Sequence, residues 1–360
     1  MKKALLVILI TFVFAVFAGV SFAAEKSETD LAIEKLMRDL EKNDGESAQP
    51  TAPAVQPAQE PQTASSPAEA LPGRPKAPGK LSAGTPETYD SLIVDVDWLA
   101  KNIKNVVLID TRPESNYATA HLTGAVNATW TYFANVNVPT GTMKYGTLYD
   151  AATMAKRIGA LGIDGNKQVV VYDDGAGWGQ AGYVTTIMRM SGIKNAKILN
   201  GGITAWRKQG QKVSTTKHTN KAVKLTIKEY SPNYVINTKW IDDNIGKAGF
   251  KLVDVRTPQE YKGMIRPFAE KRAGHLPTAI NIPMGEFSTP EFKWKSAGEI
   301  KSILTAAGIE PGDEVVVYDT VGVRAANVLM MLRLSGYVNS RFYDEGYQAW
   351  AGDSKCEIVK

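Results

Sequence analysis

Apolar residues follow two alternating patterns along most of this chain. Short runs rich in β-branched residues stop at polar or glycine-containing turns, which is typical of buried strands. Stretches in which apolar residues have helical spacing lie between these runs. The expected strands include residues 106–110, 169–172, 196–199 and 315–318, and the expected helices include residues 149–161 and 180–191. Strands that alternate with helices predict an α/β fold, in which a parallel sheet carries helices on both faces.

The whole pattern occurs twice. Asp110 and Asp254 are 144 positions apart, and so are Trp206 and Trp350. A period this long indicates a duplicated domain, because solenoid repeats are far shorter. We therefore expect two similar α/β domains at residues 89–212 and 237–353, joined by a linker at residues 213–236.

One turn in the second copy has the features of an anion-binding loop. The strand at residues 315–318 ends at Asp319, and a helical pattern begins a few residues later. In such loops the backbone N–H groups converge, and the dipole of the following helix adds partial positive charge behind them. The expected anion-binding residues are Thr320, Val321, Gly322, Val323 and Arg324. Asp173 opens the corresponding loop of the first copy.

These motifs resemble the rhodanese family of sulfurtransferases, in its two-domain form, over residues 89–351. Strand-Asp-x-Arg, Gly-His-Leu-Pro with Asn-Ile-Pro, a loop that ends in Gly-x-Arg-Ala, and a closing Gly-x-x-Ala-Trp occur in order, with counterparts in both copies. The resemblance implies two rhodanese-like domains. It also implies a catalytic cysteine at the start of the second-domain loop, written Cys-x-x-Gly-x-Arg in active members. In this chain that position is Asp319.

The aspartate changes the expected chemistry. The family carries sulfur as a persulfide on a soft, easily ionised thiolate, and a carboxylate forms no persulfide. Asp319 would also place negative charge where thiosulfate or mercaptopyruvate would bind. We expect a pseudoenzyme of the sulfurtransferase family that acts as a binding or scaffolding module. Two alternatives remain open: an active thiosulfate sulfurtransferase that uses another thiol, and phosphoryl transfer through Asp319.

The second copy also contains an expansion of ten residues, within residues 262–274. In the family this segment lies near the mouth of the active site, so its basic residues could steer an anionic substrate. The candidate steering residues are Arg256, Arg266, Lys271 and Arg272. Arg256 is also expected to form a buried ion pair with Asp254, and Arg112 is expected to form one with Asp110. Glu260 stands where some tandem members carry an arginine that grips the substrate anion.

Composition narrows the classes of partner. The net charge of +5 is small and the basic residues are scattered, so we expect no nucleic-acid partner. Cys356 is the single cysteine, which excludes an internal disulfide and a cysteine-based metal cluster. We expect no cofactor and no metal, and a partner that is either a small sulfur-containing anion or another envelope protein.

The N-terminus predicts export. Lys2 and Lys3 precede an apolar run, and Ser21-Phe22-Ala23 offers the small residues that a signal peptidase reads. We expect a signal peptide at residues 1–23, a periplasmic or otherwise exported product, and no stable membrane insertion after cleavage. The alternative is an N-terminal membrane anchor. A short amphipathic segment is expected at residues 24–45, and a disordered linker at residues 46–86, which holds half of the 18 prolines.

Overall fold

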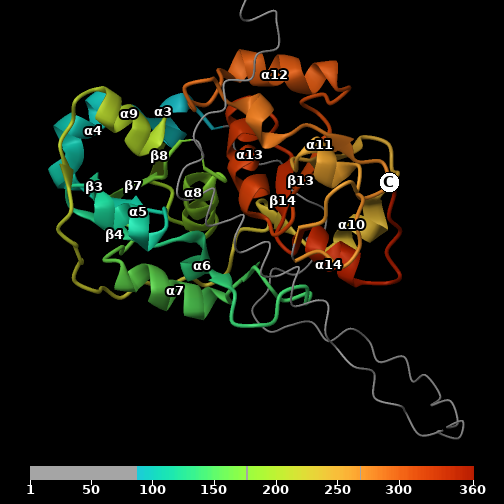
Figure 1. Ribbon diagram of the computed structural model, residues 1–360, viewed down its shortest axis with the longest axis horizontal. Coiled ribbons are helices and arrows are strands. Elements are labelled where there is room, and N and C mark those ends of the chain that lie inside the picture. The colour runs from blue at the N-terminus through green and yellow to red at the C-terminus, as the bar shows by residue number, and fades with distance from the viewer. Residues whose placement is uncertain (1–86, 176, 268) are drawn as a thin grey trace, which may run out of the picture. The chain divides into compact units, whose positions relative to one another are not determined.

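The computed structural model describes residues 87–175, 177–267 and 269–360. The expected signal peptide, amphipathic segment and proline-rich linker lie outside these residues. The described chain contains two five-stranded parallel sheets, each with helices on both faces (Figure 1). This confirms the expected fold class.

The first sheet has the strand order β1-β8-β7-β2-β4, and all of its neighbouring strands are parallel. Its strands are β1 (Ile93–Val94), β2 (Val106–Asp110), β4 (Ala125–Asn127), β7 (Gln168–Tyr172) and β8 (Ala196–Leu199). Two short antiparallel pairs join β3 (His121–Leu122) to β9 (Val213–Ser214) and β5 (Ala134–Asn135) to β6 (Thr147–Leu148). The helices are α3 (Tyr89–Leu92), α4 (Val96–Asn102), the 3-10 helix η1 (Ile103–Asn105), α5 (Glu114–Thr119), α6 (Trp130–Phe133), α7 (Ala151–Ala160), α8 (Gln180–Met190) and α9 (Gly202–Lys208).

The second sheet repeats this arrangement in the order β10-β14-β13-β11-β12. Its strands are β10 (Val235–Ile236), β11 (Phe250–Asp254), β12 (Ile280–Asn281), β13 (Glu314–Tyr318) and β14 (Ser340–Tyr343). The helices are α10 (Thr238–Asn244), α11 (Pro258–Tyr261), the 3-10 helix η2 (Met284–Phe287), α12 (Ala297–Ala306), α13 (Val323–Leu334) and α14 (Gly346–Gly352). In both sheets the strand that precedes the candidate loop is the central one.

Each central strand is apolar on both faces because both faces are buried. In β13, Val315 and Val317 belong to one apolar cluster, whereas Val316 and Tyr318 belong to another on the opposite face. β7 divides its side chains in the same way. The continuous β-branched runs in the sequence follow from this double burial.

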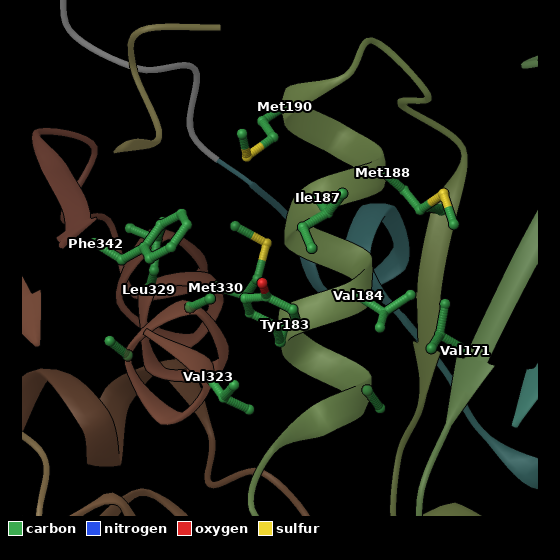
Figure 2. Packing of buried hydrophobic residues seen from close by; sticks show 14 of the residues in the cluster. Val171, Tyr183, Val184, Ile187, Met188, Met190, Val323, Leu329, Met330 and Phe342 are labelled. Atoms are coloured by element: carbon green, nitrogen blue, oxygen red, sulfur yellow. The ribbon is translucent and has the colours of Figure 1, made fainter. Parts of the chain in front are cut away.

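The two domains share one of these apolar clusters. It contains residues from both sheets and from the helices α8 and α13, which pack against each other. Figure 2 shows side chains of both helices, among them Tyr183, Ile187 and Met330, in the space between them. The hydroxyl of Thr186 on α8 donates to the carbonyl of Ala326 on α13 at 3.0 Å. The described residues accordingly form one compact unit.

The segment expected as a linker, residues 213–236, contributes a short strand at each end. β9 pairs with β3 of the first domain, and β10 forms an edge of the second sheet. Within the described ranges, no helix combines the length and apolarity needed to cross a membrane.

Candidate functional site

The candidate loop of the second domain leaves the carboxyl end of the central strand β13 and enters α13. Gly322 caps the helix with φ of 85°, a left-handed conformation that favours glycine. A Cβ at this position would lie 3.0 Å from the carbonyl oxygen of Asp344. The loop therefore fits closely against the segment that follows β14.

Asp319 is buried, with 2% of its surface exposed. Its Oδ1 accepts a hydrogen bond from the N–H of Ala325 at 3.2 Å, and its Oδ2 accepts one from Nε of Arg324 at 3.3 Å. The carboxylate thus lies at the N-terminal end of α13, where the helix dipole favours negative charge.

The loop N–H groups themselves are not bound to this carboxylate. Of the described residues, none accepts a hydrogen bond from the N–H groups of the five predicted anion-binding residues. The backbone of the loop therefore keeps the donors that an anion would use, and Asp319 is bonded instead by Ala325 and the side chain of Arg324. An anion beside it would meet both these donors and the aspartate charge.

Arg324 connects Asp319 to Glu260. Its Nη1 and Nη2 donate to the two oxygens of Glu260 at 3.0 and 2.8 Å, and Nη2 also donates to Oγ1 of Thr320 at 3.0 Å. Burial opposes the ionisation of Glu260, but the bonds and charge of Arg324, together with the bonds from Thr257, outweigh it and lower its pKa to about 2. Glu260 is therefore a counter-ion of the loop arginine.

Glu270 is a site residue that the sequence argument did not identify. Its Oε1 accepts from Thr320 Oγ1 at 2.9 Å and pairs with Arg256 Nη1 at 3.0 Å, whereas its Oε2 is buried without a hydrogen-bond partner among the described residues. Burial raises the pKa of Glu270 to about 7, although Arg256 and Thr320 act in the opposite direction. The sequence did offer one sign of its role, because Glu270 is an acidic residue in an otherwise basic expansion.

The site has more acidic than basic groups. The acids are Asp254, Glu260, Glu270 and Asp319, and the bases that pair with them are Arg256 and Arg324. With Glu270 protonated, three carboxylates still face two guanidinium groups. The side chains thus work against the anion preference of the backbone loop.

The predicted steering residues do not lie together at an entrance. Arg256 is fully buried: Nη2 pairs with Asp254 at 2.7 Å, and the guanidinium lies over the ring of Tyr347 at 4.0 Å. It cannot meet an anion that arrives from solvent, and the expected Asp254–Arg256 ion pair is confirmed. Arg272 donates to four backbone carbonyls of the C-terminal segment, those of Trp350, Ala351, Asp353 and Cys356. Arg266 and Lys271 are exposed, whereas Arg272 is half-buried.

The first-domain loop is arranged differently. Asp173 accepts from the N–H groups of Gly175 at 2.8 Å and Ala181 at 3.1 Å, and burial raises its pKa. Trp178, which stands where Arg324 stands in the second copy, is 65% exposed. A cavity of about 210 Å³ borders this loop and the segment that follows η2. The first-domain loop therefore lacks an arginine at the position of Arg324, and the guanidinium beside it is that of Arg112, whose Nη1 lies 3.4 Å from Oδ1 of Asp174.

The thiol of the single cysteine and the imidazoles of two histidines are reactive groups, but all three have structural surroundings. Cys356 is buried, and burial raises the pKa of its thiol to about 11. His121 and His275 stack on Tyr117 and Tyr261 and bond the carbonyls of those tyrosines through Nδ1, at 2.7 and 2.8 Å. No cluster of three or more potential metal ligands occurs in the part of the chain that the structure describes.

The chain thus contains two α/β domains, each with a parallel sheet and a loop between the central strand and the next helix. This architecture is that of the two-domain sulfurtransferase-like proteins. The rhodanese-like domain family matches residues 95–209 and 237–353, and the chain belongs to this family.

Similar proteins include a putative thiosulfate sulfurtransferase, SseB, of Mycobacterium tuberculosis, which is 28% identical over 76% of this chain and 91% of its own length. A thiosulfate sulfurtransferase of Corynebacterium glutamicum is 28% identical over 74% of this chain and 89% of its own. The sulfur carrier protein TtuD of Thermus thermophilus is 25% identical over 76% and 98%.

Among solved structures, wild-type EanB shares the fold, with a TM-score of 0.68 and 20% identity over 76% of this chain and 70% of that one.

Proposed function

We propose that Asp319 occupies the position of the family's catalytic cysteine, and that this chain is a rhodanese-family pseudoenzyme without cysteine-dependent persulfide chemistry. Its function is then to bind a small sulfur-containing anion or another protein of the envelope. The observation that carries the proposal is the buried Asp319 carboxylate at the start of the loop, paired with Arg324.

The chemistry of sulfur transfer supports this proposal. A thiolate attacks the outer sulfur of thiosulfate, the sulfur–sulfur bond breaks, sulfite leaves with the bonding pair, and the enzyme keeps a persulfide. A carboxylate cannot take this role. The excess of acidic groups around the loop also disfavours a dianion at the same point, so of the two proposed partners it favours a protein over a small anion.

Exchange of the aspartate tests the proposal. Asp319→Cys should give a thiol with a pKa below the ordinary value of about 8.5, because the loop N–H groups, which bond no described residue, and the α13 dipole favour the thiolate. It should also give measurable transfer of sulfur from thiosulfate to cyanide. Asp173→Cys is the matched control, since its loop lacks the arginine, and we expect no activity from it or from the native protein.

A second candidate is an active sulfurtransferase or sulfur carrier that uses another thiol, as the names of the relatives suggest. The chain offers only Cys356, whose raised pKa disfavours the thiolate. Thiocyanate formation by the native protein that is lost in Cys356→Ser would establish this candidate and contradict the first.

We further propose that the protein is exported, on the strength of Lys2, Lys3 and the apolar run that follows. N-terminal sequencing of the native protein should find a chain that starts at residue 24 or 25. An intact Met1 in the membrane fraction would instead establish the anchor.

A further inference from the structure

A second cavity lies far from the candidate loop, at the C-terminal ends of α8 and α13. Its volume is about 550 Å³, and Arg189 and Arg333 both line it. These arginines are 144 positions apart, so they are equivalent in the two copies. Arg333 is separated from Arg324 by nine residues of helix, or roughly 14 Å. The cavity is therefore distinct from the loop.

In the first domain the arginine has a carboxylate partner. Nη2 of Arg189 lies 2.8 and 2.6 Å from the two oxygens of Glu87, and both side chains are almost completely buried. Nη1 of Arg189 donates to the carbonyls of Ser91 and Ala196. The guanidinium of Arg189 thus binds both oxygens of a carboxylate, while backbone carbonyls hold it in place.

In the second domain the arginine keeps its backbone carbonyl partners but has no paired carboxylate among the described residues. Nη2 of Arg333 donates to the carbonyls of Asn233 and Ser340, and the guanidinium lies 3.9 Å from the centre of the Tyr234 ring. Arg333 is 2% exposed, yet no carboxylate of the described residues lies within ion-pair distance, and its Nε is buried without a hydrogen-bond partner among them. Burial lowers its pKa.

Other arginines buried to this extent have acidic partners. Arg256 pairs with Asp254 and Glu270, and Arg341 pairs with Glu314. The counterpart of Glu87 in the second copy is Glu229, which precedes Asn233 by four residues as Glu87 precedes Ser91. Glu229 lines the cavity but is exposed, and it forms no ion pair in the described structure. The charge of Glu87 acts on Arg333, but Glu87 forms its ion pair with Arg189. A buried charge without a paired counter-ion is costly, so the position favours an anion from outside the chain.

We propose that this cavity binds a small free oxyanion of the size of sulfate, held by the guanidinium of Arg333, with Lys194 at its edge. Glu87 is neutralised by Arg189, so its charge opposes the anion little. Glu229 opposes it more, as does the partial negative charge at the ends of α8 and α13. The preference therefore depends on Arg333 and is weakened by Glu229.

Calorimetric titration with sodium sulfate, at an ionic strength held constant with chloride, tests the proposal. Arg333→Met should weaken sulfate binding at least tenfold, whereas Arg207→Met, which removes an exposed charge elsewhere, should leave it unchanged. Glu229→Gln should strengthen it severalfold. Sulfate affinity that is equal in the native protein and Arg333→Met would overturn the proposal, and that result is also expected if sulfate binds only at the Asp319 loop.

Arg333 also anchors two backbone carbonyls, so its substitution could disturb the fold. A measurement on the native protein avoids this difficulty. Crystals of the native protein soaked in selenate should show an anomalous peak within hydrogen-bond distance of the Arg333 guanidinium. A peak absent from that position while selenate binds elsewhere would contradict the proposal.

Discussion

Glu260 and Glu270 are two buried acids in the same cluster whose pKa values move in opposite directions. Glu260 receives two bonds from Arg324 and others from Thr257, which together outweigh its burial. Glu270 shares Arg256 with Asp254, and one of its oxygens has no hydrogen-bond partner, so its burial prevails. The number of bonds that each carboxylate accepts therefore decides the sign of its shift.

This difference predicts two separate limbs in the pH dependence of stability. The folded state raises the pKa of Glu270 from 4.5 to about 7, so its protonated form stabilises the fold below pH 4.5, and this stability is lost as the pH rises to about 7. The limb amounts to at most about 3 kcal/mol. Glu270→Gln, which mimics the protonated acid, should flatten it in urea unfolding measured at several pH values.

Glu260→Gln serves as the counterpart. Its pKa is lowered from 4.5 to about 2, so its contribution is present above pH 4.5 and is lost as the pH falls toward 2. The variant should flatten only this acid limb. A Glu270→Gln protein that keeps the decline between pH 4.5 and 7 would show that another group causes it.

At the scale of elements, the loop depends on a glycine whose backbone no other residue adopts easily. Gly322→Ala should destabilise the protein for two reasons: its φ of 85° and a contact of 3.0 Å with the Asp344 carbonyl. Gly336 has a φ of 90° but nothing within 4 Å of an added Cβ, so Gly336→Ala isolates the conformational cost, about 1–2 kcal/mol. Urea unfolding should show a larger loss for Gly322→Ala, and equal losses would mean that the loop yields to the added methyl group.

The sequence predicted the long elements well and the short ones poorly. β2 was expected at residues 106–110 and lies there, because a strand buried on both faces is an uninterrupted apolar run. The one-turn helix α6 and the two-residue strands β5 and β6 were not foreseen, since tertiary contacts stabilise such short elements and local pattern does not reveal them.

The same limit applies to the site. The loop was visible as a local motif, but Glu270 meets Thr320 across 50 residues of sequence, and Arg189 meets Glu87 across 102. Arg256 was expected both to pair with Asp254 and to steer substrate. Only its burial, which the sequence does not reveal, decides between these roles.

At the scale of the molecule, the two domains depend on the contact between α8 and α13. An ideal Cβ on Gly182 would lie 2.0 Å from Oδ1 of Asn327 and 2.6 Å from its Cα, so the helices approach too closely for any side chain at this point. Gly182→Ala should therefore destabilise the protein by about 1–3 kcal/mol through overpacking.

Gly298 provides the control, because it is an exposed residue of helix α12 and an added Cβ would have nothing within 4 Å. Gly298→Ala should stabilise the protein by up to about 1 kcal/mol, owing to the helix preference of alanine. Thermal unfolding of both variants should show shifts in opposite directions. A stabilised Gly182→Ala protein would show that the two helices can separate at little cost.

The Gly182–Asn327 contact also bears on how two copies of one unit come to differ. Two identical subunits that met through these helices would form an isologous dimer, in which each residue must serve both halves of a self-complementary interface. Fusion into a single chain removes that requirement. The position equivalent to Gly182 is Ala326, and the position equivalent to Asn327 is Tyr183. The contact that corresponds to Gly182–Asn327 in the other half of the interface is therefore made by alanine and tyrosine. The interface has diverged into two complementary halves, and each domain now has the other as its specific partner.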